Sequence, residues 1–528
     1  MRQSRLSIQR PAAQFDILLL LMTVLVLASY AIFRYGGYWG ETDTFAFANA
    51  IRAIQTSAEL TPQGQSYPNG YGFQALSVFM MSFLGITLDQ WLLVVGTFLV
   101  GWIVFPAWLL YRELTASPRG ATLATVILFV QAEFLFPVLR GSHEKFTRGL
   151  MLFCLFLLVR SLKTRYEPKR FAGWLIAFYL AVFGLITFNS LLAISFIVAT
   201  CLALGLNWTA MRFFNRKRTK KADPASQRLT YAALISMGMA FLFTFYIYQP
   251  AIHHLDLFQS IWDKVAALLL DVEESATDPY QVVSLGWINL PTYLTVSIGN
   301  WIILLVSAIL WVSKTVQWLF TDEKPRKISE MILWAFYGAF AFIGALSVLI
   351  DFSGAIDGNL QVRSFPSFAM LAAPFIARWV MSRRATNWHR VTRLGWLAVM
   401  VLAVFATLKA TNEPSLSNKW LFYFEPELQA IEFADATLED TAVWTGYDER
   451  LVTAVGIREG LGNYDITLAH DVRQIEDTRN FLVTDITNQR GQRLARPLPV
   501  EVGGDSLITY DNGFAELYHL RPRTPYEP

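Results

Sequence analysis

Long apolar runs divide most of this chain into segments long enough to cross a lipid bilayer. A hydrocarbon core of roughly 30 Å needs about 20 apolar helical residues, and runs of about this length recur as far as residue 411. They lie at 15–33, 91–110, 120–138, 171–188, 190–208, 229–248, 292–313, 329–350, 365–381 and 394–411, with a shorter one at 146–159. The pattern therefore predicts a mainly α protein, a polytopic membrane helix bundle of about eleven spans.

The segment 71–85, about 15 residues long, is marginal for a span. It decides the orientation of the whole bundle, because one extra crossing inverts every later loop. If it does not cross, the basic loops at 111–119, 160–170, 211–228, 314–328 and 382–393 all share the side of the basic N-terminus. Because Lys and Arg concentrate in cytoplasmic loops, we expect a juxtamembrane helix here and a cytoplasmic N-terminus in an integral plasma-membrane protein.

The composition changes after residue 411, where charges become frequent and the apolar runs shorten. Short β-like runs occur at 442–444, 480–483 and 506–520, and the last contains an Asn512-Gly513 turn signal. We therefore expect a membrane module at 1–411, with a first outer loop at 34–90, and a small C-terminal α/β domain at 412–528. An odd number of spans places this domain on the extracytoplasmic side.

Composition and charge exclude several classes of protein. The chain is 54% hydrophobic and 16% charged, and its net charge of +3 is too small to predict a nucleic-acid partner. Its two cysteines, Cys154 and Cys201, lie within apolar runs, so they predict neither a disulfide framework nor a zinc site. Membrane lipids are the partner that the composition predicts.

The first outer loop carries an acidic pair, Glu41 and Asp43, directly before an apolar-periodic stretch at 45–54. This stretch predicts an amphipathic helix on the membrane surface, with Asp43 or Thr44 as its N-cap. Ionisable residues that gather at one membrane surface are functional candidates. The alternative is that Thr42 and Asp43 only cap the helix.

Two further outer loops carry ionisable residues. The connection at 139–149 contains His143, Glu144, Lys145 and Arg148, and the predicted topology lets it meet Asp43 across the bundle. The loop at 351–364 ends with Arg363, whose planar guanidinium suits bidentate binding of a phosphate. In the alternative interpretation, these basic side chains only contact lipid headgroups.

Three features follow the first span in order: a Glu-x-Asp pair, an amphipathic helix and the element Tyr67-Pro68-Asn69-Gly70-Tyr71. This arrangement resembles the GT-C superfamily of membrane glycosyltransferases, which includes protein mannosyltransferases, aminoarabinose transferases and oligosaccharyltransferases. Glu41-Thr42-Asp43 matches the acidic motif of that superfamily, while Glu144 and Arg363 match a second acidic residue and a late arginine that contacts the carrier phosphate. The tail lacks a Trp-Trp-Asp acceptor motif, which argues against transfer to asparagine sequons.

The resemblance implies an inverting glycosyltransferase of the cell envelope. Such an enzyme moves a hexosyl or pentosyl group from a polyprenyl phosphate or diphosphate to a hydroxyl of a glycan, lipid or protein acceptor. Asp43 would be the general base and Glu41 would orient the acceptor. The resemblance gives the remaining candidates a substrate- or phosphate-binding role: His143, Glu144, Lys145, Arg148, Arg363, Tyr67 and Tyr71.

A divalent metal ion, Mg²⁺ or Mn²⁺, stays open as a cofactor. The carboxylates of Glu41, Asp43 and Glu144 are the hard oxygen ligands that such an ion prefers. The resemblance does not require it, because several members of the superfamily work without a metal.

Three other functions remain as alternatives. A lipid-linked polysaccharide polymerase or ligase usually carries a basic mid-chain outer loop, whereas the loop at 249–290 is acidic. A transporter would place ionisable residues within its spans. Such residues are scarce in the apolar runs of this chain, and Glu133 is the main exception. A structural or sensory protein would not depend on the outer carboxylates.

Overall fold

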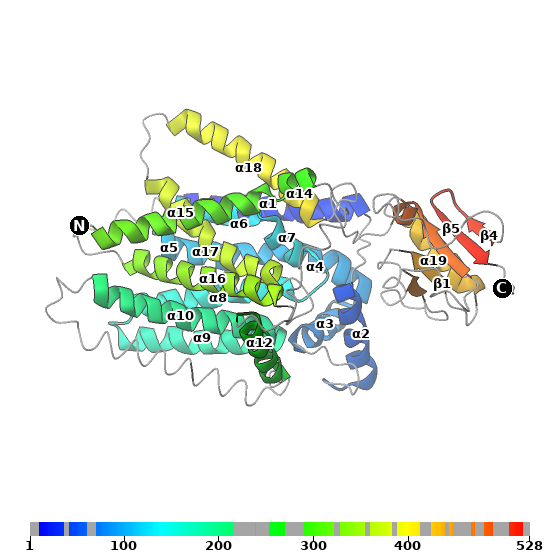
Figure 1. The fold of residues 1–528 in the computed structure, drawn as a ribbon, viewed down its shortest axis with the longest axis horizontal. Helices are drawn as coiled ribbons and strands as arrows, with labels where there is room; N and C mark the ends of the chain where they lie inside the picture. Colours follow the sequence, from blue (N-terminus) through cyan, green and yellow to red (C-terminus); the bar gives the residue numbers. More distant parts are fainter. Residues whose placement is uncertain are drawn as a thin grey trace.

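A computed structural model of the chain shows a bundle of long helices with a small sheet domain beyond one end (Figure 1). It describes residues 10–35, 42–60, 70–214, 238, 253–269, 290–320, 328–353, 360–382, 388–411, 424–438, 443–446, 466–469, 480–488 and 506–520. Most of these residues are helical, so the predicted mainly α class is confirmed.

The helices follow one another in short connections. The first are α1 (Arg10–Tyr35), α2 (Thr42–Ser57), α3 (Gly72–Leu84), α4 (Gly96–Phe98), α5 (Val104–Thr115), α6 (Pro118–Phe129), α7 (Ala132–Leu139), α8 (Glu144–Lys163), α9 (Pro168–Phe188) and α10 (Ser190–Phe214). A π-helical segment, η1 (Gln90–Val95), and a 3₁₀ segment, η2 (Leu99–Ile103), join α4 and α5 into one continuous stretch. The later helices are α12 (His253–Leu269), α14 (Leu290–Val296), α15 (Ile298–Phe320), α16 (Ile328–Phe352), α17 (Leu360–Ser382) and α18 (Trp388–Ala410).

Among the described residues, seven helical stretches are long and apolar enough to cross a membrane. They are Gln14–Arg34, Gln90–Thr115, Pro168–Phe188, Ser190–Ala210, Ile298–Phe320, Ile328–Phe352 and Leu360–Ser382. The predicted run at 146–159 lies within α8, and the run at 394–411 follows α18 to its end at Ala410. The run at 229–248 lies outside the described residues, except for Gly238. The chain is therefore a multi-pass membrane protein.

The run at 120–138 is not the straight span that the sequence predicts. It consists of α6 and α7, which meet at an angle of 76°. The bend lies beside two polar residues, Gln131 and Glu133, within an otherwise apolar segment. The Glu133 carboxylate accepts hydrogen bonds from Lys409 of α18 and from Asn300 of α15. A buried charge is costly without a partner, so these contacts offset the cost of placing Glu133 within the bundle.

The helices of the predicted first outer loop, α2 and α3, lie together at the end of the bundle that carries the sheet domain (Figure 1). α3 has 13 residues, and its first residue, Gly72, lies against the backbone of Thr187 at the end of α9. This is consistent with the predicted juxtamembrane helix at 71–85. The predicted N-cap was wrong, because α2 already begins at Thr42, which places Asp43 in its first turn.

The opposite end of the bundle carries a different set of charges. Glu113 at the end of α5 pairs with Arg160 and Lys163 in the last turn of α8. Arg378, near the end of α17, pairs with Glu330 in the first turn of α16. This end therefore holds the last turns of α8 and α17 and the first turn of α16. The opposite ends of these three helices lie at the end of the bundle that carries α2 and α3.

The C-terminal domain packs one helix, α19 (Glu425–Thr437), on a five-stranded sheet. Its strands are β1 (Val443–Gly446), β2 (Ile466–Ala469), β3 (Asn480–Thr484), β4 (Ser506–Asp511) and β5 (Ala515–Leu520), in the order β2-β1-β3-β5-β4. β1 pairs in parallel with β2 and β3, and β5 pairs antiparallel with β3 and β4. The predicted turn at Asn512-Gly513 is confirmed, since Gly513 has a φ of 76° between the two strands.

Candidate functional site

The connection between α7 and α8 holds a group of charged side chains that are almost inaccessible. The exposed fraction is 9% for Arg140, 6% for Glu144, 1% for Lys145 and 0% for Arg148. Charged residues are rarely buried to this extent unless they are paired. We call these four residues and Arg363 of α17 the basic cluster.

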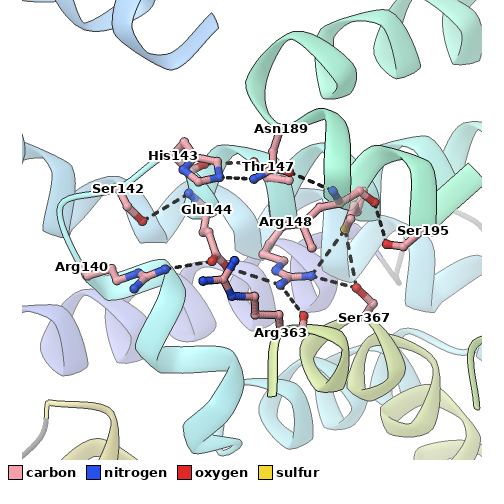
Figure 2. Close-up of polar contacts among 12 residues, drawn as sticks. Arg140, Ser142, His143, Glu144, Thr147, Arg148, Asn189, Ser195, Arg363 and Ser367 are labelled. Carbon is pink, nitrogen blue, oxygen red and sulfur yellow. Dashed lines mark hydrogen bonds and ion pairs between the residues drawn. The ribbon is translucent and has the colours of Figure 1, made fainter. Parts of the chain in front are cut away.

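Glu144 is the anion that holds the basic cluster together. Its Oε1 lies 2.9 Å from Nη2 of Arg140, and its Oε2 lies 3.3 Å from Nη2 of Arg148 (Figure 2). Burial opposes ionisation of this carboxyl, but the positive charges of Arg140 and Arg148 outweigh it and lower its pKa to about 2. Glu144 is therefore ionised at neutral pH, and both of its oxygens have guanidinium partners.

Arg148 connects α8 to α17. Its Nη2 donates to the carbonyl oxygen of Arg363 at 2.7 Å, and its Nη1 donates to Oγ of Ser367 at 2.8 Å (Figure 2). With the bond to Glu144, both terminal nitrogens of this guanidinium have protein partners. Arg148 thus fixes where the first turns of α17 lie.

Lys145 packs against the π-helical segment that precedes α4. Its Nζ donates to the carbonyl oxygen of Arg140 at 2.6 Å. A Cβ added at Gly96 would lie 3.4 Å from this nitrogen and 2.9 Å from the carbonyl oxygen of Trp91, to which the Gly96 N–H donates. Glycine at position 96 therefore accommodates both the wide helical turn and the buried ammonium group.

His143 is buried between aromatic rings and an amide. Its ring centroid lies 4.8 Å from that of Phe47 on α2, and its Nε2 contacts Nδ2 of Asn189. Asn189 is the single residue between α9 and α10, and its Oδ1 accepts the N–H of Leu192 at 2.8 Å. This leaves Nδ2 to donate to His143, so Nε2 is the acceptor, which favours the neutral imidazole over the protonated form.

α2 meets the connection between α7 and α8 directly. A Cβ added at Gly141 would lie 3.0 Å from Cγ2 of Thr44, and Thr44 is fully buried. Thr44 follows Asp43 in the chain, so the structure brings the acidic segment to the edge of the basic cluster. Glu41, Tyr67 and the side chain of Asp43 lie outside the described residues. Tyr71 directly precedes α3 and packs against the main hydrophobic core.

Arg363 differs from the other cations of the basic cluster because its side chain is exposed. Figure 2 shows it beside Glu144, and its charge also lowers the pKa of that carboxyl. Within the part of the chain that the structure describes, its guanidinium makes neither a hydrogen bond nor an ion pair. As far as the described residues go, its guanidinium donors are therefore available for an anion.

Glu144 does not fit the predicted role of a metal ligand. Both of its oxygens already accept from guanidinium groups, and the positive charge of Arg363 also acts on it, which disfavours a divalent cation. Over the described ranges, no group of three or more His, Cys, Asp or Glu residues is arranged to hold a metal ion. This finding does not bear on Glu41 and Asp43.

Two residues that contribute to the site were not predicted from the sequence as site residues. Asn189 orients His143, and Ser367 accepts a hydrogen bond from Arg148. A polar residue at a junction of one residue between two apolar helices was the available signal for Asn189. Ser367 gave no such signal, because its partner lies 219 residues away.

Comparison with known proteins identifies the fold. No protein-family model and no curated protein matches the sequence. The oligosaccharyltransferase of Archaeoglobus fulgidus, solved with a tethered acceptor peptide, is similar in structure, with a TM-score of 0.54 at 11% identity over 89% of this chain and 69% of that one. The same enzyme in complex with an inhibitory peptide and a dolichol-phosphate has a TM-score of 0.52 at 10% identity, over 97% of this chain and 75% of that one. Its complex with zinc and sulfate has a TM-score of 0.53 at 12% identity, over 88% of this chain and 68% of that one.

These similarities establish the fold. Oligosaccharyltransferases are among the GT-C enzymes that the sequence resembles, so the predicted resemblance is confirmed at the level of architecture. The activity of this chain has to be argued from its own residues.

Proposed function

We propose that this protein is an inverting glycosyltransferase that transfers a sugar from a polyprenyl phosphate or diphosphate to an acceptor hydroxyl. Asp43 is the general base, and Arg363 binds the phosphate of the donor. The extracytoplasmic face of the plasma membrane is the site of the reaction, and the C-terminal domain lies on the same side. The N-terminus is cytoplasmic.

One observation carries this proposal: the contact between Thr44 and Gly141. It brings the acidic turn of α2 against the basic cluster. The cluster has four basic residues, whereas Glu144 and the nearby Asp351 provide two carboxylates. A base for a hydroxyl and a binding site for an anionic leaving group must be close together in such a transfer. The excess of two positive charges suits a phosphate.

The reaction requires a proton acceptor on one side of the sugar and an anion site on the other. Asp43 takes the proton of the acceptor hydroxyl as its oxygen attacks the anomeric carbon, while the bond from that carbon to the phosphate oxygen breaks. Proton transfer to a positioned base contributes about 10²–10⁴-fold to the rate. The leaving phosphate carries the released electron pair, and the free guanidinium of Arg363 stabilises its charge. Glu41 orients the acceptor.

The buried members of the basic cluster provide a rigid and positively charged wall. Arg140, Lys145 and Arg148 donate hydrogen bonds to protein groups. They therefore stabilise a bound phosphate through their charge, whose position is fixed before the substrate binds. Preorganised charges of this kind need no rearrangement during the reaction. We assign His143, Tyr71 and Tyr67 to the same substrate-binding element, next to α2 and α3.

The fold relatives support the chemical class of the substrates. The archaeal oligosaccharyltransferase has been solved with a dolichol-phosphate and with an acceptor peptide. A lipid-linked donor and a separate acceptor are therefore compatible with this fold. The same enzyme also has a zinc complex, and in this chain a divalent ion would fall to Glu41 and Asp43, because Glu144 does not fit as a ligand.

The test is Asp43→Asn, with Asp263→Asn as the matched control. Asp263 is an exposed carboxylate on α12. Lipid-linked sugars and their acceptor products would be profiled in cells that lack the protein and are complemented with each variant. We expect the donor to accumulate and the product to fall at least about 100-fold with D43N, as for the loss of a general base, and wild-type profiles with D263N. Full complementation by D43N would overturn the proposal.

A further inference from the structure

The N-terminus of α17 is held by a carboxylate from the preceding helix. Asp351 lies in the last turn of α16 and is 4% exposed. Its Oδ1 accepts the N–H of Leu360 at 2.8 Å, and its Oδ2 accepts the N–H of Gln361 at 2.8 Å. These are the first two residues of α17, whose N–H groups have no partner within their own helix. Asp351 therefore supplies acceptors for the first two of the four N–H groups that lack a partner at this helix end.

Arg363 lies one turn beyond this anchor. Its carbonyl oxygen is fixed by Arg148, and the next residue, Ser364, shares a 2.6 Å hydrogen bond with Ser347 of α16. The backbone of this turn is therefore held from α8 and from α16. The exposed guanidinium of Arg363 depends on these backbone anchors for its position, because no described residue bonds to it.

We propose that Asp351 is a positioning residue that aims Arg363 at the phosphate of the lipid-linked donor. The inference rests on the proposed function. A helix N-terminus is itself a binding site for anions, through its free N–H groups and its dipole. Here the Asp351 carboxylate occupies that position, so an incoming phosphate is directed to the side chain of Arg363.

Positioning and simple electrostatics predict opposite results when the charge of Asp351 is removed. Asp351→Asn keeps the shape of the side chain but takes away one negative charge and one of two good acceptors. If Asp351 acted only through its charge, the variant would bind a phosphate more tightly. If Asp351 positions Arg363, the variant binds it more weakly.

The probe is undecaprenyl phosphate, titrated into the full-length protein in nanodiscs. We expect Arg363→Ala to weaken binding about tenfold or more, as for the loss of a charge-assisted hydrogen bond. We expect D351N to weaken it about three- to tenfold, and the double variant D351N/R363A to bind no more weakly than R363A. Leu360→Pro is a second variant that leaves Asp351 in place, because proline is tolerated at the first helical position but lacks the N–H. It should weaken binding in the same direction as D351N.

Glu330→Gln is the matched control, since Glu330 is the carboxylate by which the other end of α16 contacts α17. It should leave binding unchanged even if it lowers Tm. Tighter binding by D351N, or an equal additional loss in the R363A background, would overturn the positioning role. Absence of binding by the wild type would overturn the proposed donor and this inference with it. Weakening by R363A alone, with D351N unchanged, would overturn only the role of Asp351.

Discussion

Arg148 on α8 donates to the carbonyl oxygen of Arg363 on α17 at 2.7 Å, across 215 residues of sequence. One arginine therefore fixes the backbone of another, whereas no described residue bonds to the guanidinium of the second. The same Arg148 is neutralised by Glu144, four residues earlier on its helix. Residues of similar charge in this site thus have different tasks, and variants of each should give different results.

Removing the Glu144 carboxylate should destabilise the whole protein. Glu144→Ala leaves Arg140 and Arg148 buried without an anion, and breaking a buried ion pair from one side costs about 3–5 kcal/mol. The free energy of unfolding in detergent, measured with a chemical denaturant, checks this. The control is Glu167→Ala, which removes an exposed pair with Arg170 and should cost at most about 1 kcal/mol. Equal losses for the two variants would mean that the pairing of Glu144 adds nothing to stability.

The pH dependence of stability should identify the same carboxylate. Its pKa is lowered from 4.5 to about 2 in the folded protein, so the folded state binds fewer protons than the unfolded state. The stabilisation is therefore complete above pH 4.5 and is lost as the pH falls towards 2. Tm should fall more steeply over this range in the wild type than in Glu144→Gln. Above pH 4.5 the two pH profiles should run parallel, and a divergence there would contradict the assignment.

The packing of α8 allows no side chain at Gly149. A Cβ added there would lie 2.0 Å from Cζ2 of Trp102, so Gly149→Ala should destabilise by about 1–3 kcal/mol through overpacking. Gly173→Ala on α9 is the matched control, because a Cβ at that position meets no atom within 4 Å. That substitution should be neutral or stabilising by up to about 1 kcal/mol. Thermal unfolding of both variants tests the contrast, and a G149A protein as stable as the wild type would refute the predicted clash.

The predicted orientation can be tested with single cysteines in a background that lacks Cys154 and Cys201. Leu507 on β4 is 53% exposed, and the side chain of Arg170 at the opposite end of the bundle is 71% exposed. We expect Leu507→Cys to react with an impermeant thiol reagent added to intact cells, and Arg170→Cys to react only after permeabilisation. The reverse pattern would place the C-terminal domain in the cytoplasm. His143 is unsuitable for this labelling because it is 2% exposed.

The apolar runs were sufficient to predict the helices, because a span needs only length and hydrophobicity. Ten of the eleven predicted runs fall on described helices. The run at 292–313 is divided between the short helix α14 and the long helix α15, which begins at Ile298. The bend between α6 and α7 was not predictable from hydropathy. It depends on partners of Glu133 that lie on α15 and α18, far away in sequence.

The residue types of the site were predictable from the sequence, but the burial and the bonding partners of each residue were not. Sequence spacing indicates that Glu144 and Arg148 are neighbours on one helix face. It does not indicate that Arg148 is fully buried and bonded to α17, whereas Arg363 is exposed. Asp351 was visible only as an acidic residue in a loop, because its role depends on N–H groups nine and ten residues later.

The ion pair between Lys409 and Glu133 determines where this chain can be shortened. Lys409 is in the last turn of α18, and it also donates to Ser297 at 2.8 Å. We expect a protein ending after Thr411 to retain these contacts. A protein ending a few residues earlier leaves Glu133 without its cation at the bend that precedes Arg140. We therefore expect a protein that ends at residue 411 to keep the bend between α6 and α7, and one that lacks Lys409 to lose the ion pair that holds it.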